Sequence, residues 1–246
     1  IVIKDKNENE WVWVEVPKTT VFSGLNIDVN GTFTSQNYTD IANKMITYAG
    51  VYRKGSVNQE CNWTDEWYDG CGLTQQKYIE AYQSMLKSVY TYGGFWIGRY
   101  EAGIDGSITD LTKARTTHTT VTIGTSPKAI SQKDAIPYNF VYCSEAQMLA
   151  NEMTPASNYR SSLMFGIQWD LVCKFLEVKS NLTTADINSD SGSWGNYSNI
   201  ARKITSSRAK QSSNNGMTWT SISGQKESKN IMLSTGASDD TNRLNI

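Results

Sequence analysis

Three aromatic side chains in one polar loop are the residues of this sequence best suited to binding a ligand. The loop runs from Cys61 to Cys71 and carries Trp63, Trp67 and Tyr68 together with three carboxylates. Exposed aromatic rings beside polar groups are typical of surfaces that bind sugars or other proteins. The rings could instead pack inward and pin the loop to the core, and the sequence leaves both interpretations open.

A second group of polar residues has part of the spacing of a calcium-binding loop. Asp186, Asn188 and Asp190 alternate along the chain and are followed by Gly192. Calcium prefers hard oxygen ligands, which such loops supply from alternate positions. The full EF-hand pattern also needs a glutamate at its twelfth position, which this segment lacks, so a solvated turn is the alternative. Calcium is the one cofactor that the sequence suggests.

Four cysteines and a single histidine limit the remaining chemistry. Cys61 and Cys71 either close the aromatic loop with a disulfide in an oxidising compartment or remain as two thiols. Their spacing differs from paired CxxC motifs and imidazole ligands are scarce, so we expect no structural zinc site. Cys143 and Cys173 are expected to be buried like small apolar residues. His118 lies in a polar stretch with no catalytic constellation around it, and we expect an exposed loop histidine.

Composition and charge argue against two classes of partner. The chain has 246 residues, of which 39% are hydrophobic and 19% charged, and its formal net charge is −1. No basic block provides the electrostatic footprint of a nucleic-acid-binding protein. No apolar run is long enough to span a bilayer, so membrane attachment would require a segment outside this chain. Eight tryptophans and thirteen tyrosines indicate a loop-rich fold pinned by aromatic side chains.

Helix and strand signals are clearest in the first hundred residues. The β-rich run over 11–16 predicts a strand, and a second strand is expected over 95–101. A short helix is expected over 38–48. A longer helix is expected over about 75–91, because Thr74 can cap its start, a Gly-Gly pair follows it, and apolar residues recur on one face: Tyr78, Tyr82, Met85 and Val89.

The rest of the chain is expected to be mostly loop. Residues 103–135 are rich in Thr, Ser and Gly and should hold at most a hairpin. One helix is expected to open at Ser144. Another is expected over about 166–178, with an apolar face made of Ile167, Leu171, Phe175 and Val178. No linker or fixed-period repeat interrupts the chain, so we expect one domain over residues 1–246.

Four segments resemble, in order, the formylglycine-generating (sulfatase-modifying) enzyme family. Residues 94–102 (GFWIGRYEA) are similar to that family's early FWIxxYEVT strand, and residues 137–146 (PYNFVYCSEA) to its PVxxVSWxDA strand-to-helix segment. Residues 166–170 (GIQWD) resemble its EAEWE helix, and residues 193–197 (SWGNY) its YPWGN segment. The resemblance implies an α+β, C-type-lectin-like fold with few short helices and small mixed or antiparallel sheets.

The chain departs from that family where the family does its chemistry. The resemblance would place a copper-binding cysteine pair and the GNVWEW segment beyond Ile246, so we expect the domain to be truncated at its C-terminal end. None of the four cysteines matches the family's catalytic positions, which favours a protein that is not an enzyme.

We therefore expect a bacterial or phage surface or secreted module that displays loops for a glycan or protein ligand. An oxidase that lacks its catalytic segment in this chain is one alternative. A structural subunit of a pilus or surface layer is the other.

Overall fold

The computed structural model describes residues 1–52, 74–106, 114–154, 159–188, 202–204, 210–213, 218–221, 224–226 and 232–236. Within these stretches the chain forms helices and small antiparallel sheets, so the prediction of an α+β protein is confirmed at this level. The chain divides into two compact units. The first unit comprises residues 1–12, 98–163 and 191–246, and the second unit comprises residues 13–97 and 164–190. The single domain over residues 1–246 stays a prediction.

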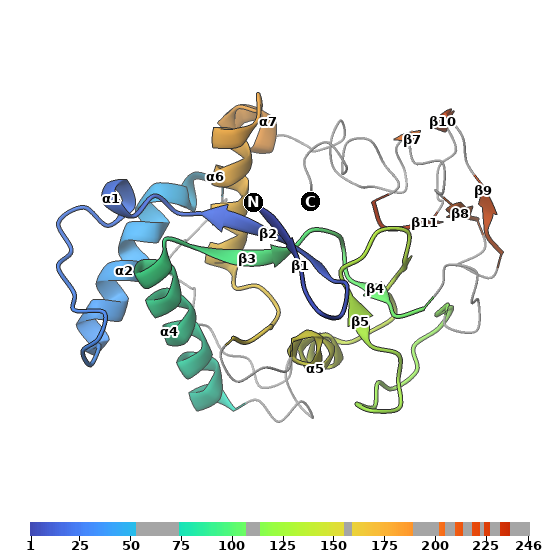
Figure 1. The fold of residues 1–246 in the computed structure, drawn as a ribbon, viewed down its shortest axis with the longest axis horizontal. Helices are drawn as coiled ribbons and strands as arrows, with labels where there is room; N and C mark the ends of the chain where they lie inside the picture. The colour runs from blue at the N-terminus through green and yellow to red at the C-terminus, as the bar shows by residue number, and fades with distance from the viewer. Residues whose placement is uncertain are drawn as a thin grey trace. The chain divides into compact units, whose positions relative to one another are not determined.

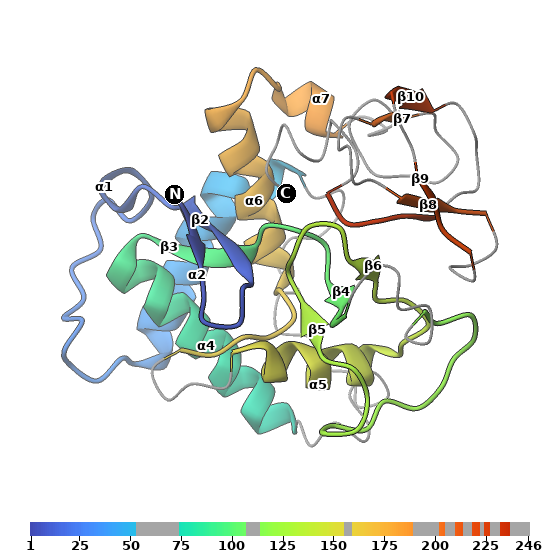
Figure 2. The same ribbon diagram turned by 45° about the vertical axis from the view of Figure 1, so that its right-hand side comes forward.

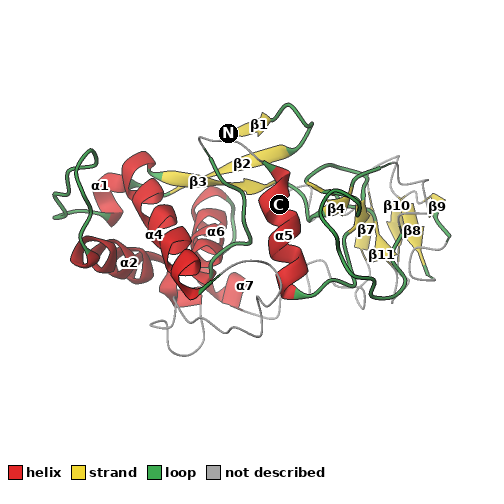
Figure 3. Cartoon of the chain, turned by 90° about the horizontal axis from the view of Figure 1, so that it is seen from below, coloured by secondary structure: helices red, strands yellow, loops and turns green. Residues whose placement is uncertain are grey.

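Three long helices dominate the second unit (Figure 1). They are α2 (Ser35–Ala49), α4 (Gln75–Tyr92) and α6 (Gly166–Lys179), accompanied by the shorter α1 (Lys18–Val21), η1 (Gly50–Tyr52) and α7 (Thr184–Asn188). Helix α2 packs against both α4 and α6 (Figure 3). The side chains of Ile41 and Met45 are fully buried, and they place α2 at the centre of this core.

Capping side chains set the starts of α2 and α4. Thr34 and Asn37 form a capping box, in which Asn37 N donates to Thr34 Oγ1 at 3.2 Å and Thr34 N donates to Asn37 Oδ1 at 2.9 Å. Helix α2 is therefore longer than the predicted helix over 38–48. The start of α4 is as predicted, because Thr74 Oγ1 accepts a hydrogen bond from the backbone of the first turn. Gly93 ends α4 with φ at 77°, a conformation that favours glycine.

The buried faces of two helices differ from the predicted ones. In α4 the side chain of Leu86 is buried, whereas Met85 is only half-buried. In α6 Phe175 is half-buried and Val178 is exposed, although both were expected in the core. Helix α6 has apolar residues on several sides, so packing against α2, η1 and α7 selects the face that is buried. That face consists of Ile167, Asp170, Leu171, Val172, Cys173 and Leu176.

Two strands contribute to the second unit beside the helices. Strand β2 (Glu10–Glu15) includes most of the predicted strand over 11–16, and β3 (Gly94–Gly98) is shorter than the predicted strand over 95–101. Val14 is buried and Trp13 is half-buried, as alternation along β2 requires. Trp13 meets Trp96 edge-on with ring centroids 5.1 Å apart. Gly94 leaves room for this indole, since a Cβ there would lie 2.5 Å from the Trp13 ring.

The first unit is built from short strands. Strand β1 (Val2–Lys4) pairs antiparallel with the start of β2. A three-stranded sheet has the order β5-β4-β6, from β4 (Gly103–Ile104), β5 (Ala129–Ile130) and β6 (Ile136–Pro137). The remaining strands are β7 (Arg202–Ile204), β8 (Lys210–Ser212), β9 (Thr220–Ser221), β10 (Gly224–Lys226) and β11 (Met232–Leu233). The predicted loop over 103–135 therefore holds two strands of this small sheet.

Helix α5 (Cys143–Met153) is the long helix of the first unit and packs against β5 (Figure 2). Its buried residue Leu149 joins Val121 and Ala129 in a small core. The cap of α5 is Tyr142, two residues before the predicted Ser144. The cap differs because the side chain of Glu145 reaches back to the backbone N–H of Tyr142, which places the first turn earlier.

Candidate functional site

A histidine and a glutamate far apart in the sequence meet in the first unit. His118 Nε2 lies 3.1 Å from both carboxylate oxygens of Glu145. Glu145 is 5% exposed, whereas the side chain of His118 keeps an exposed fraction of 32%. The prediction that His118 is exposed is confirmed. The sequence did not predict its contact with Glu145, which helix α5 supplies.

The Glu145 carboxylate is fixed by the backbone as well as by the imidazole. The N–H groups of Val121 and Tyr142 each donate a hydrogen bond of 2.9 Å, one to each oxygen. Burial by itself would raise the pKa of this carboxyl. The two backbone donors and His118 outweigh burial, so the pKa of Glu145 lies below its ordinary value. An ionised carboxylate can only accept, so the shared hydrogen is carried by His118 Nε2.

The exposed side of this pair is aromatic. The ring of His118 stacks on the ring of Tyr142, with centroids 4.1 Å apart and an angle of 34° between the planes. Tyr142 is nevertheless 63% exposed, so only part of its surface is covered. Phe140, two residues earlier, is 42% exposed. We call His118, Phe140 and Tyr142 the aromatic surface.

Arg115 holds together the two loops that carry the aromatic surface. Its Nη2 donates to the carbonyl oxygen of Thr119 at 2.6 Å and to that of Phe140 at 2.7 Å. Its guanidinium also lies 5.6 Å from the centre of the Tyr138 ring. Phe140 has φ at 52°, which is uncommon outside glycine, and the bond from Arg115 stabilises this backbone. The loop before β5 and the loop before α5 are thereby fixed to each other.

The contacts of His118 among the described residues do not include a nucleophile. Nucleophilic catalysis would need a nucleophile hydrogen-bonded to the imidazole. Within the described part of the chain, His118 hydrogen-bonds only to Glu145, through Nε2. Its Nδ1 is left to accept or donate a hydrogen bond toward a ligand. The surface therefore offers flat rings with one oriented polar group beside them.

Glu145 has a role that sequence reasoning missed. The signal was its position three residues after Tyr142 at the start of a helix, which is the spacing of a capping box. No comparable signal links Glu145 to His118, because the contact is long-range.

The residues predicted to bind a ligand, Trp63, Trp67 and Tyr68, lie outside the described residues, as does Asp190 of the predicted metal site. Asp186 and Asn188 are described, and each has a structural contact. Asp186 Oδ2 accepts hydrogen bonds of 2.7 Å from both the N–H and the hydroxyl of Thr183, which caps α7.

Asn188 donates to the carbonyl oxygen of Val51 at 3.2 Å. Asp186 and Asn188 both lie in α7, where residues two apart do not share a face. The structure therefore does not bring these two oxygen ligands together, and calcium binding stays a prediction.

The cysteines fall into different environments. Cys61 and Cys71 lie outside the described residues, so their disulfide stays a prediction. Cys173 is buried as expected, and burial raises the pKa of its thiol to about 11. Cys143 is exposed, so the expectation that it is buried is wrong. The reason is that Cys143 is the first residue of α5 and points away from its buried face, whereas Cys173 lies mid-helix on the packed side of α6.

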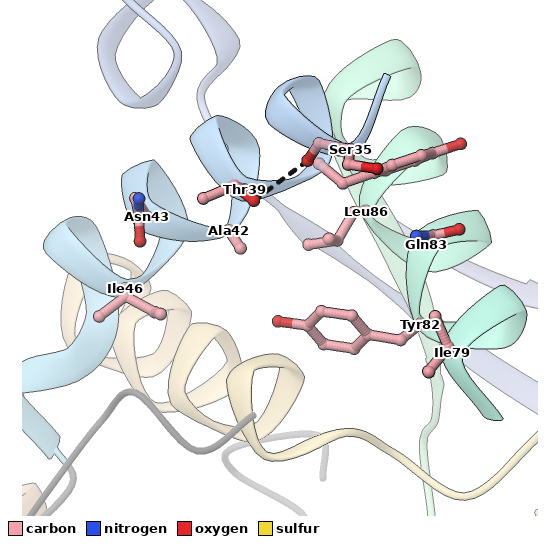
Figure 4. A pocket seen from close by; sticks show the side chains of 10 residues that line it. Ser35, Thr39, Ala42, Asn43, Ile46, Ile79, Tyr82, Gln83 and Leu86 are labelled. Carbon is pink, nitrogen blue, oxygen red and sulfur yellow. Dashed lines mark hydrogen bonds between the residues drawn. The ribbon is translucent and has the colours of Figure 1, made fainter. Parts of the chain in front are cut away.

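A groove of about 530 Å³ lies between α2 and α4 in the second unit (Figure 4). Its apolar lining residues include Ile46, Ile79 and Leu86, and Figure 4 shows the Tyr82 ring reaching across from α4 toward Ile46. Its size suits a small molecule, but the described residues that line it include no charged side chain. The aromatic surface, with an oriented imidazole, is the stronger candidate.

The described residues contain neither a metal-binding cluster nor a membrane-spanning helix. No three His, Cys, Asp or Glu side chains converge there as a metal ion would require. None of the helices in those stretches combines the length and the apolar character needed to cross a bilayer.

A scan against protein-family models and searches of curated proteins and of solved structures found no match to this chain.

Proposed function

We propose that this chain is a non-catalytic binding module that recognises a glycan or protein ligand through exposed, pre-positioned aromatic side chains. One observation carries the proposal. Tyr142 is 63% exposed, yet its ring is stacked on His118 and its backbone N–H is bonded to Glu145. A side chain that is already ordered before binding loses little conformational entropy when a ligand arrives.

The scaffold is proposed to be C-type-lectin-like and related to the formylglycine-generating family. Three of the four resembling segments support this. Residues 94–102 include β3, residues 137–146 run from the end of β6 into α5, and residues 166–170 begin α6. These are the strand, strand-to-helix and helix that the resemblance implies. We propose a bacterial or phage surface or secreted location on the same basis, with calcium as the metal to test.

A glycan and protein array probed with and without calcium tests the binding function. We expect at least one ligand to bind, and Tyr142→Ala to weaken that binding. Tyr92→Ala is the matched control, because Tyr92 is also an exposed tyrosine, at 71%, but lies at the end of α4 in the second unit. The proposal fails if no ligand binds in either calcium or EDTA, or if both variants bind like the wild type.

A further inference from the structure

We infer that the ligand of the aromatic surface is an uncharged sugar ring that stacks on the exposed side of Tyr142. This inference rests on the proposed function and narrows its ligand to one class. It follows from three properties of the surface: a flat ring presented to solvent, a polar group held beside it, and charged side chains that are engaged within the protein.

The flat ring is presented in a defined orientation. His118 covers part of Tyr142, with ring centroids 4.1 Å apart, so the remaining surface of the tyrosine ring is open to a ligand. Phe140 adds a second exposed ring, and Arg115 fixes its backbone. The C–H faces of a sugar ring are apolar, and they match an aromatic face that is held rigidly.

The polar group beside the ring is the imidazole of His118. Its Nε2 is committed to the buried carboxylate of Glu145, which also fixes the orientation of the ring. Nδ1 therefore remains for a ligand, at the edge of a ring that stacks on Tyr142. A sugar carries hydroxyl groups around its apolar face, so one of them can bond to Nδ1 while the face stacks.

Glu145 and Arg115 are the charged residues that contact the aromatic surface within the described stretches, and both are engaged in internal contacts. Glu145 is 5% exposed, and the Nη2 atom of Arg115 is bonded to two carbonyl oxygens. Binding of phosphate, nucleic acid or an acidic sugar would need an available cation, so these ligands fit poorly. A stable protein interface usually needs about 20 residues a side, far more than the aromatic surface supplies.

The test uses a panel of free uncharged saccharides: glucose, galactose, mannose, N-acetylglucosamine and their β-linked disaccharides. Saturation-transfer NMR on the full chain reports which sugar protons contact the protein. We expect transfer to the ring C–H protons of at least one sugar. We expect Tyr142→Ala to weaken that binding about tenfold, because the variant loses one aromatic contact and the area that this contact buries. Tyr142→Phe, which keeps the ring, and Tyr92→Ala should both bind like the wild type.

The outcomes separate this inference from the proposed function. The inference is overturned if no saccharide in the panel shows transfer, or if Tyr142→Ala binds the sugar as tightly as the wild type does. It is also overturned if glucuronate binds more tightly than glucose, because the site would then prefer a charged ligand. If the sugars fail but a protein on the array binds through Tyr142, only the inference falls. If neither sugars nor proteins bind, the proposed function falls as well.

Discussion

The Glu177 carboxylate is the best place to test the electrostatics of the second unit. It accepts hydrogen bonds from Lys174 Nζ at 2.8 Å, from Thr184 Oγ1 at 2.7 Å and from the hydroxyl of Tyr52. These donors come from α6, α7 and η1, so one side chain ties three elements together. The ion pair with Lys174 and the hydrogen bond from Tyr52 lower the pKa of Glu177 to about 2. Burial, followed by the nearby carboxylate, raises the pKa of Tyr52.

Replacing Glu177 by glutamine removes the charge and nearly keeps the shape. Lowering the pKa from 4.5 to about 2 corresponds to about 3 kcal/mol of stabilisation in the ideal case. The side chains of Glu177 and Lys174 are each 22% exposed, so water screens part of this interaction. We therefore expect Glu177→Gln to lower the free energy of unfolding by about 1–2 kcal/mol at pH 7.

The pH dependence of this difference has a definite sign. A lowered folded-state pKa stabilises the protein above the unfolded pKa of about 4.5 and loses that effect as pH falls toward about 2. The difference in free energy of unfolding between wild type and Glu177→Gln should therefore be largest at pH 7 and shrink steadily below pH 4.5. Urea unfolding followed by tryptophan fluorescence at several pH values measures it.

Glu15→Gln is the matched control for Glu177→Gln. Glu15 pairs with Lys179 at 3.0 Å, but both side chains are 52% exposed, so its loss should cost about 0.5 kcal/mol or less. The reasoning would be refuted if the two variants lost equal free energy of unfolding, or if the loss in Glu177→Gln did not change with pH.

Three further predictions follow from the described contacts. Gly94→Ala should lower the free energy of unfolding by about 1–3 kcal/mol, because the new Cβ collides with the Val14 carbonyl oxygen and the Trp13 ring, and thermal melts measure this. Iodoacetamide at neutral pH should alkylate Cys143 but not Cys173 in the native protein, which peptide mapping can show; equal rates would contradict the burial. Glu145→Gln should cost about 1–3 kcal/mol at pH 7, because a backbone N–H loses its acceptor. That cost should diminish as pH falls below the ordinary carboxyl value of 4.5, and a pH-independent cost would contradict the lowered pKa of Glu145.

The parts of the fold that the sequence predicted correctly depend on local signals. Helix α4 has its cap at Thr74 and its stop at Gly93, and both act within one turn of the chain. The buried face of α6 was predicted wrongly because the helix has apolar residues on several sides. The packing of α6 against α2, η1 and α7 decides that Leu176 is buried and Val178 is not.

The candidate site was hard to predict for a related reason. His118 and Glu145 are 27 positions apart, and no repeat or motif connects them. Their meeting depends on β5 and α5 packing together, with Arg115 bridging two loops. The sequence pointed instead to loop aromatics such as Trp67, which lie outside the described residues. Long-range polar contacts of this kind become visible only in three dimensions.

The double role of Glu145 has a consequence for how this surface can change during evolution. Glu145 starts α5 through the N–H of Tyr142 and also orients His118. A substitution there would disturb a helix and a binding surface together, so selection should act strongly against it. The side chains of Phe140 and Tyr142 are exposed and do not belong to the small core of Val121, Ala129 and Leu149. Substitutions at these two positions should therefore leave that core intact. New ligand preferences should therefore arise by exchange at these two positions.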